Sequence, residues 1–90
     1  MQELRTLIDE IDRDLVAKIA LRVKCIEQAA KLKIEVGLPA HIPERIEAVI
    51  SNVRLRAVEV GTAPDLVENI WRVMIDWAVK HETDLMRKDI

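Results

Sequence analysis

The chain has little of several residue types that mark particular classes of protein. Its 90 residues include no Phe, no Tyr, two Trp and one Cys, Cys25. A single Cys excludes an internal disulfide and fits a reducing compartment, so we expect a cytoplasmic protein. The 14 Lys and Arg do not exceed the 16 Asp and Glu, and this balance argues against a nucleic-acid partner. No apolar run approaches the length that a membrane span needs.

Glycine and proline are also sparse, and their positions divide the chain. Neither occurs before Gly37, so the sequence predicts one long helix over residues 2–35 that stops at this glycine. Pro43 fits the first turn of a second helix, predicted over residues 43–60 and ended by Gly61.

A third helix is predicted from the residues that follow Gly61. Thr62 and Asp65 form a capping-box pattern, with Pro64 in the first turn, and the helix is expected to run to about residue 88. Apolar residues recur at helical spacing throughout. The sequence therefore predicts one all-α domain over residues 1–90, built from three helices with short loops.

Two cations interrupt the apolar face of the first helix. The apolar positions fall within an arc of about 80° on a helical wheel, and Arg22 and Lys33 lie in the middle of this arc. They are eleven residues apart, which places them on one face at about 16 Å separation. Because an unpaired buried charge is costly, we interpret the two as groups that hold an anionic ligand. The apolar positions are Leu4, Ile8, Ile11, Leu15, Ile19, Ile26 and Ala29.

The length of the first helix points to a second copy of the chain. A helix of thirty-odd residues spans about 50 Å, whereas a compact 90-residue domain has a radius of gyration near 12 Å. Arg5 lies about 25 Å before Arg22 and is rotated from it by roughly 100°. One small-molecule site therefore cannot easily take both residues from one chain, and a partner would have to supply Arg5.

The third helix carries a carboxyl group on its apolar face. Glu82 falls on the helical wheel between Ile75 and Ala78, so it is expected to point inward like Arg22 and Lys33. Convergent charged groups in an apolar bundle are typical of a site for a polar ligand. His41 and His81 have no second pair of ligands at suitable spacing, so no metal site is predicted.

These features, taken in order, resemble the all-helical chorismate mutase family, which includes the related isochorismate pyruvate lyases. The resemblance covers essentially the whole chain. It is carried by LRxxIDxID from Leu4, by the segments that end at Arg22 and Lys33, by PERIE from Pro43, and by WRVMIDWAVKHE, which ends at Glu82. It implies an intertwined homodimer with two sites, and a small dicarboxylate substrate, with no cofactor and no metal.

The resemblance also implies residue roles. Arg22 and the Arg5 of the other chain would bind the two carboxylates of chorismate, and Lys33 would hydrogen-bond the ether oxygen. Glu44 would accept from the ring hydroxyl, and Glu82 would meet the ether oxygen from the opposite side if it is protonated. Many relatives have Arg where this chain has Pro43. Arg45 is expected to point elsewhere on the helix and to contact only the rim of the ligand.

Three functions stay open from the sequence. The favoured one is chorismate mutase, which converts chorismate to prephenate in aromatic amino acid biosynthesis. The PAHIPER loop and Trp77 look more like isochorismate pyruvate lyase, which forms salicylate. The third is a helical dimerisation or regulatory module without catalysis. A pure scaffold would gain stability by replacing inward charges with apolar residues, which argues against that third function.

Overall fold

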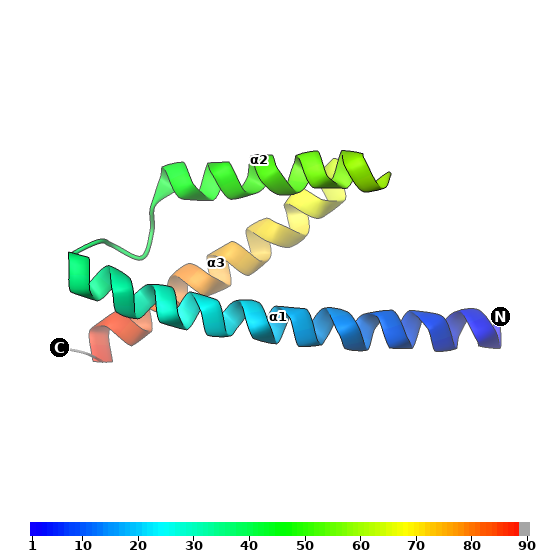
Figure 1. Ribbon diagram of the computed structural model, residues 1–90, viewed down its shortest axis with the longest axis horizontal. Helices are drawn as coiled ribbons and strands as arrows, with labels where there is room; N and C mark the ends of the chain where they lie inside the picture. The colour runs from blue at the N-terminus through cyan, green and yellow to red at the C-terminus, as the bar shows by residue number, and fades with distance from the viewer. Residues whose placement is uncertain (89–90) are drawn as a thin grey trace.

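The computed structural model describes residues 1–88 and contains three helices (Figure 1). Helix α1 spans Gln2–Val36, α2 spans Pro43–Val60 and α3 spans Pro64–Lys88. No strand occurs among these residues. The predicted all-α class, the three helices and their bounds to within a residue or two are therefore confirmed.

The helix ends follow the glycine and proline positions. Gly37 adopts a left-handed conformation with φ 74°, and the N–H of Leu38 then donates to the carbonyl of Lys33 at 2.8 Å. Gly61 ends α2 in the same way with φ 78°. A side chain with a Cβ is strained at such positive φ values, so glycine is the favoured residue at both stops.

The predicted cap of the third helix is wrong in one detail. Helix α3 begins at Pro64, and the carbonyl of Ala63 accepts from the N–H of Val67 at 3.2 Å. Ala63 therefore occupies the capping position that was expected for Thr62. The carboxylate of Asp65 accepts from Arg54 of α2 at 2.9 Å, which joins the two helices close to their shared turn.

Helix α3 crosses between the other two helices and contacts both (Figure 1). The backbones of α1 and α2 do not contact each other within residues 1–88. The core is small and consists of side chains on the facing surfaces. Its buried apolar residues are Ala30, Ile50, Ala57, Ile75 and Ala78. This arrangement leaves space between α1 and α2 that α3 closes on one side.

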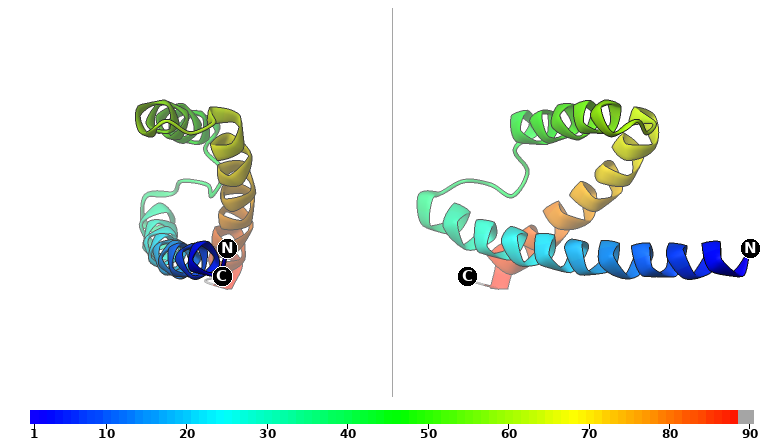
Figure 2. Two further views of the ribbon diagram at one scale, coloured as in Figure 1. Left: turned by 90° about the vertical axis from the view of Figure 1, so that its right-hand side faces the viewer. Right: turned by 45° about the vertical axis from the view of Figure 1, so that its right-hand side comes forward.

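The N-terminal half of α1 projects away from the other helices (Figure 2). Every residue from 1 to 21 is exposed, including the apolar face that was predicted from the sequence. The Cα radius of gyration is 15.8 Å and the longest dimension is 53 Å, well above the 12 Å or so expected for a compact chain of this length. An apolar helix face of this extent is typical of a surface that another chain covers.

Candidate functional site

A cavity of about 380 Å³ lies between the three helices, where α1 and α2 stand apart. Most of its wall is apolar, but four charged side chains reach it from all three helices. Its volume suits a small organic molecule, and the few polar groups in an apolar wall are typical of a ligand site. The lining residues are Arg22, Cys25, Ile26, Ala29 and Lys33 of α1, Arg45, Ile46 and Val49 of α2, and Ile75, Ala78, Val79 and Glu82 of α3.

An ion pair between α1 and α3 forms one end of the cavity. The Lys33 Nζ donates to Glu82 Oε2 at 2.8 Å and to the backbone carbonyl of Ala40 at 3.1 Å. Glu82 is only 3% exposed, and the Lys33 side chain is 20% exposed. The loop before α2 and the last turns of α3 therefore fix the position of this ammonium group.

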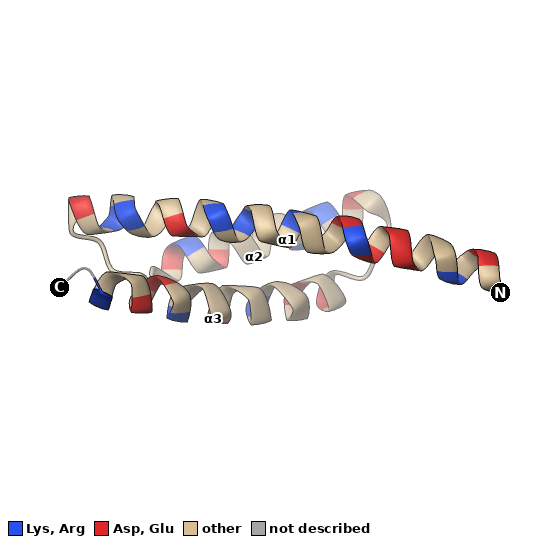
Figure 3. Cartoon of the chain, turned by 90° about the horizontal axis from the view of Figure 1, so that it is seen from below, with Lys and Arg blue, Asp and Glu red and all other residues tan. Residues whose placement is uncertain are grey.

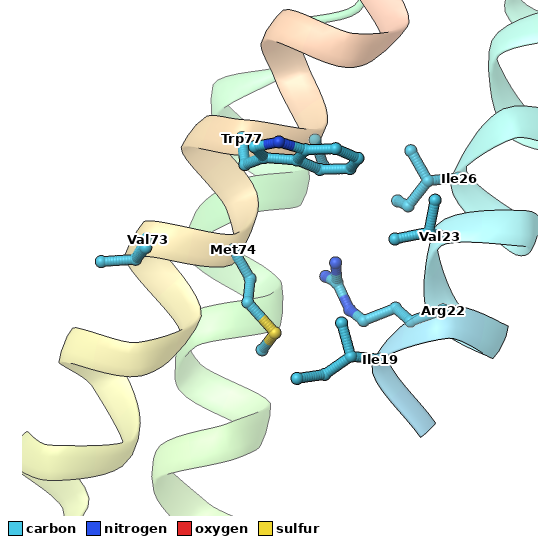
Figure 4. A pocket seen from close by; sticks show the side chains of 8 residues that line it. Ile19, Arg22, Val23, Ile26, Val73, Met74 and Trp77 are labelled. Atoms are coloured by element: carbon cyan, nitrogen blue, oxygen red, sulfur yellow. The ribbon is translucent and has the colours of Figure 1, made fainter. Parts of the chain in front are cut away.

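Arg22 lines both this cavity and a neighbouring apolar pocket of about 270 Å³ between α1 and α3. Figure 4 shows its guanidinium group reaching from α1 toward Met74 and the ring of Trp77. Trp77 also stacks on His81 with ring centroids 4.7 Å apart. His81 in turn hydrogen-bonds Glu27 of α1 at 2.8 Å, so this pair is a second polar link between α1 and α3.

The structure brings three of the five predicted site residues together. Arg22, Lys33 and Glu82 line the same cavity. Arg5 is exposed on the projecting half of α1, and Glu44 is exposed in the first turn of α2 and is not among the lining residues. Their predicted roles remain predictions.

Arg45 and Cys25 line the cavity although the sequence analysis did not assign them to it. Arg45 does not point away from the site; it is exposed and borders the cavity, as the expected contact at the rim requires. It directly precedes Ile46 and lies four residues before Val49, and both of these also line the cavity. Helical spacing from these apolar residues is the signal that could have identified it.

The described residues contain neither a metal-binding cluster nor a membrane-spanning helix. Residues 1–88 contain no cluster of three His, Cys, Asp or Glu side chains arranged to hold a metal ion. Within the same residues, no helix is both long and apolar enough to cross a membrane.

The chain is similar in sequence to two bacterial T-proteins. It is 38% identical over 72 residues to the T-protein of Haemophilus influenzae. The aligned residues are 80% of this chain and 19% of that protein. It is 31% identical over 81 residues to the T-protein of Enterobacter agglomerans, covering 90% of this chain and 22% of the relative. The chain thus spans about a fifth of the length of these two relatives.

A third relative is closer to this chain in length. The chorismate mutase of Methanocaldococcus jannaschii is 28% identical over 76 residues, which are 84% of this chain and 77% of that enzyme. In addition, the family model of chorismate mutase type II matches residues 4–83. This match runs from the start of α1 almost to the end of α3 and includes every residue that lines the cavity. This chain therefore belongs to the chorismate mutase type II family.

Proposed function

We propose that this chain catalyses the rearrangement of chorismate to prephenate. The observation that carries the proposal is the set of charged groups in the cavity. Arg22, Lys33, Arg45 and Glu82 surround one apolar-walled space, and three cations with one carboxylate leave a net formal charge of +2. This charge complements a substrate that has two carboxylates. The family match and the relative named chorismate mutase support the same assignment.

The reaction makes one specific demand on the site. Chorismate rearranges by a pericyclic step in which the ether bond lengthens and its oxygen gains negative charge. A cation held near that oxygen stabilises the transition state more than the ground state. Lys33 fits this role because Ala40 and Glu82 already hold its ammonium group, so little reorganisation is needed during the reaction. Guanidinium groups that grip the carboxylates keep the substrate in its compact reactive shape.

Glu82 is buried and accepts a hydrogen bond from Lys33 at 2.8 Å. In this scheme it orients the ammonium group toward the ether oxygen. Glu82→Gln keeps a hydrogen-bond acceptor for Lys33 and should retain most of the activity, whereas Glu82→Ala releases the ammonium group and should lower the turnover number. Equal turnover numbers of the two variants would remove Glu82 from the mechanism.

We further propose that the active form is a homodimer in which α1 of one chain completes the site of the other. The projecting half of α1 carries an exposed apolar face together with Arg5. Burial of this face against a second copy brings Arg5 to a site in another chain. We place the protein in the cytoplasm, which is consistent with its free Cys25 and the reducing conditions there.

The test is to incubate the purified protein separately with chorismate and with isochorismate and to identify the products. Prephenate from chorismate is the expected result. Salicylate and pyruvate from isochorismate, with chorismate unchanged, would establish the lyase instead. If neither compound is converted, binding of each should be measured by calorimetry. Failure to bind either compound would overturn the proposal and leave the non-catalytic dimerisation module.

A further inference from the structure

Two polar links join α1 to the C-terminal part of α3. The Lys33 Nζ donates to Glu82 Oε2 at 2.8 Å, and the His81 Nε2 donates to Glu27 Oε2 at 2.8 Å. Within residues 1–88, no other side-chain hydrogen bond connects these two helices. Figure 3 shows acidic and basic residues on both helices where α3 lies beside α1.

The apolar contact between α1 and α3 involves small side chains. Ala30 is the only buried residue among the described residues of α1, and Ala78 is buried on α3. A methyl group projects too little to interlock firmly with the ridges of a facing helix. Polar contacts are therefore needed to fix the rotation of α3 and its position along α1.

The two links together restrain α3 in a way that neither does alone. Glu27 and Lys33 are six residues apart on α1, which is about 9 Å along the helix axis. Their partners His81 and Glu82 are adjacent on α3 and are turned by about 100° from each other. A single contact allows α3 to rotate about it, whereas two contacts at separate points oppose both rotation and sliding.

The imidazole ring of His81 is itself held in place. Trp77, about one turn earlier on α3, stacks on it with ring centroids 4.7 Å apart and an angle of 21° between the planes. The stack restricts rotation of the imidazole and keeps its Nε2 directed at Glu27. His81 is half-buried, so the α1–α3 contact also shields the ring in part from water.

We propose that His81 is a positioning residue, whose hydrogen bond to Glu27 holds α3 so that Glu82 orients the Lys33 ammonium group in the cavity. This inference rests on the proposed function and adds to it two residues that do not line the cavity. The ammonium group depends on acceptors in α3 and in the loop before α2, so a small shift of α3 changes its direction. A misplacement of about 1 Å can lower a rate by about a hundredfold.

Steady-state kinetics of His81→Leu provide the first test. The turnover number for chorismate should fall by about tenfold to a hundredfold, because the ammonium group is misplaced. KM should change by less than about threefold, since the groups that hold the carboxylates are unaltered. His81→Gln keeps a donor toward Glu27 and should recover part of the loss. Arg54→Gln removes hydrogen bonds between α2 and α3 instead, and this matched control should keep the parent turnover number.

A double substitution tests whether His81 acts through Glu82. Glu82→Ala already releases the ammonium group, so adding His81→Leu to it should lower the turnover number by less than about twofold further. Independent effects would multiply instead. Glu27→Leu removes the same hydrogen bond from the side of α1 and keeps the Trp77 stack, so it replaces His81→Leu in both tests if that variant does not fold.

A measurement without substrate follows the ammonium group directly. An ammonium group held by two acceptors, as Lys33 is by Ala40 and Glu82, is protected from proton exchange with water. It should give a nitrogen NMR signal in the full chain at low temperature, assigned by its absence from Lys33→Met. The signal should broaden or disappear in His81→Leu and persist in Arg54→Gln.

Three results would overturn the inference. One is a turnover number of His81→Leu within about twofold of the parent value, too small for a misplaced group. Another is an equal loss from His81→Leu with and without Glu82→Ala. The third is a Lys33 signal that is unchanged in His81→Leu or absent from the parent chain. Failure of the proposed function is a separate result, in which the unaltered protein converts neither chorismate nor isochorismate, and the ammonium spectra still test the positioning of Lys33.

Discussion

A subunit-mixing experiment tests whether each site is shared between two chains. Within one straight helix Arg5 lies about 25 Å from Arg22, and it is exposed on the half of α1 that projects from the other helices. If Arg5 serves the site of the partner subunit, then Arg5→Gln and Arg22→Gln each inactivate every site of their own homodimers. In a mixed dimer, one site carries both substitutions and the other carries neither.

The expected magnitude follows from random exchange of subunits. Equal amounts of the two inactive variants give mixed dimers as half of the population, and each mixed dimer has one intact site. The mixture should therefore regain about a quarter of the parent activity in a two-fold symmetric dimer. The assay follows loss of chorismate after the two variants are unfolded together, refolded and compared with each variant refolded alone.

A second mixture is the matched control. Arg22 and Lys33 line one cavity within one chain, so mixing Arg22→Gln with Lys33→Met leaves one substitution in every site and should restore nothing. If the first mixture is no more active than its components while size measurements show mixed dimers, Arg5 does not serve the partner's site. Equal recovery in both mixtures would refute the assignment of Arg22 and Lys33 to one site.

Three further predictions concern catalysis, assembly and stability. Lys33→Met should lower the turnover number by about a hundredfold or more in steady-state kinetics. The reason is that one fixed donor to a developing oxyanion contributes about 2.7–4 kcal/mol. A loss of less than about threefold contradicts the role of Lys33. Ile11→Asp puts a charge on the exposed apolar face of α1 and should give monomers in analytical ultracentrifugation. The control Leu55→Asp, on an exposed part of α2, should form dimers normally. Equal behaviour of the two variants would argue against a dimer interface on α1. Hydrogen bonds from Arg72 and then Arg54 hold the pKa of Glu68 below its ordinary value of 4.5, so its stabilising effect is present above that value and is lost as pH falls through the lowered pKa. The melting temperature of Glu68→Gln should consequently decrease less on acidification than that of the parent chain, and parallel decreases would contradict the assigned cause.

Local sequence signals were sufficient for most of the fold. Gly37 and Gly61 end their helices because both positions have positive φ, and Pro43 begins α2 because its fixed φ suits the first turn. The interruption of an apolar face by Arg22, Lys33 and Glu82 was also visible from helical periodicity alone. One local error was the cap of α3, where Ala63 takes the position that hydrogen-bonding preference had assigned to Thr62.

Contacts between distant residues could not be derived in this way. Glu82 pairs with Lys33, which lies 49 residues away in the chain, although Arg22 is on the same face of α1 as Lys33. Which cation reaches Glu82 depends on how α3 crosses α1 and on the loop that brings Ala40 to the ammonium group. Helical periodicity shows the face on which a side chain lies but contains no information about the angle between two helices.

Periodicity and residue positions were enough to predict three helices, a first helix too long for a compact chain, and the inward charges of Arg22, Lys33 and Glu82. The remaining members of the site depend on how the helices pack. Glu44 and Arg45 are adjacent in the chain and both exposed, yet the rotation of α2 on α3 makes Arg45 a lining residue of the cavity and leaves Glu44 outside it. The physical reason is that this rotation is set by the packing of apolar side chains on two helices, and no local signal within α2 contains it.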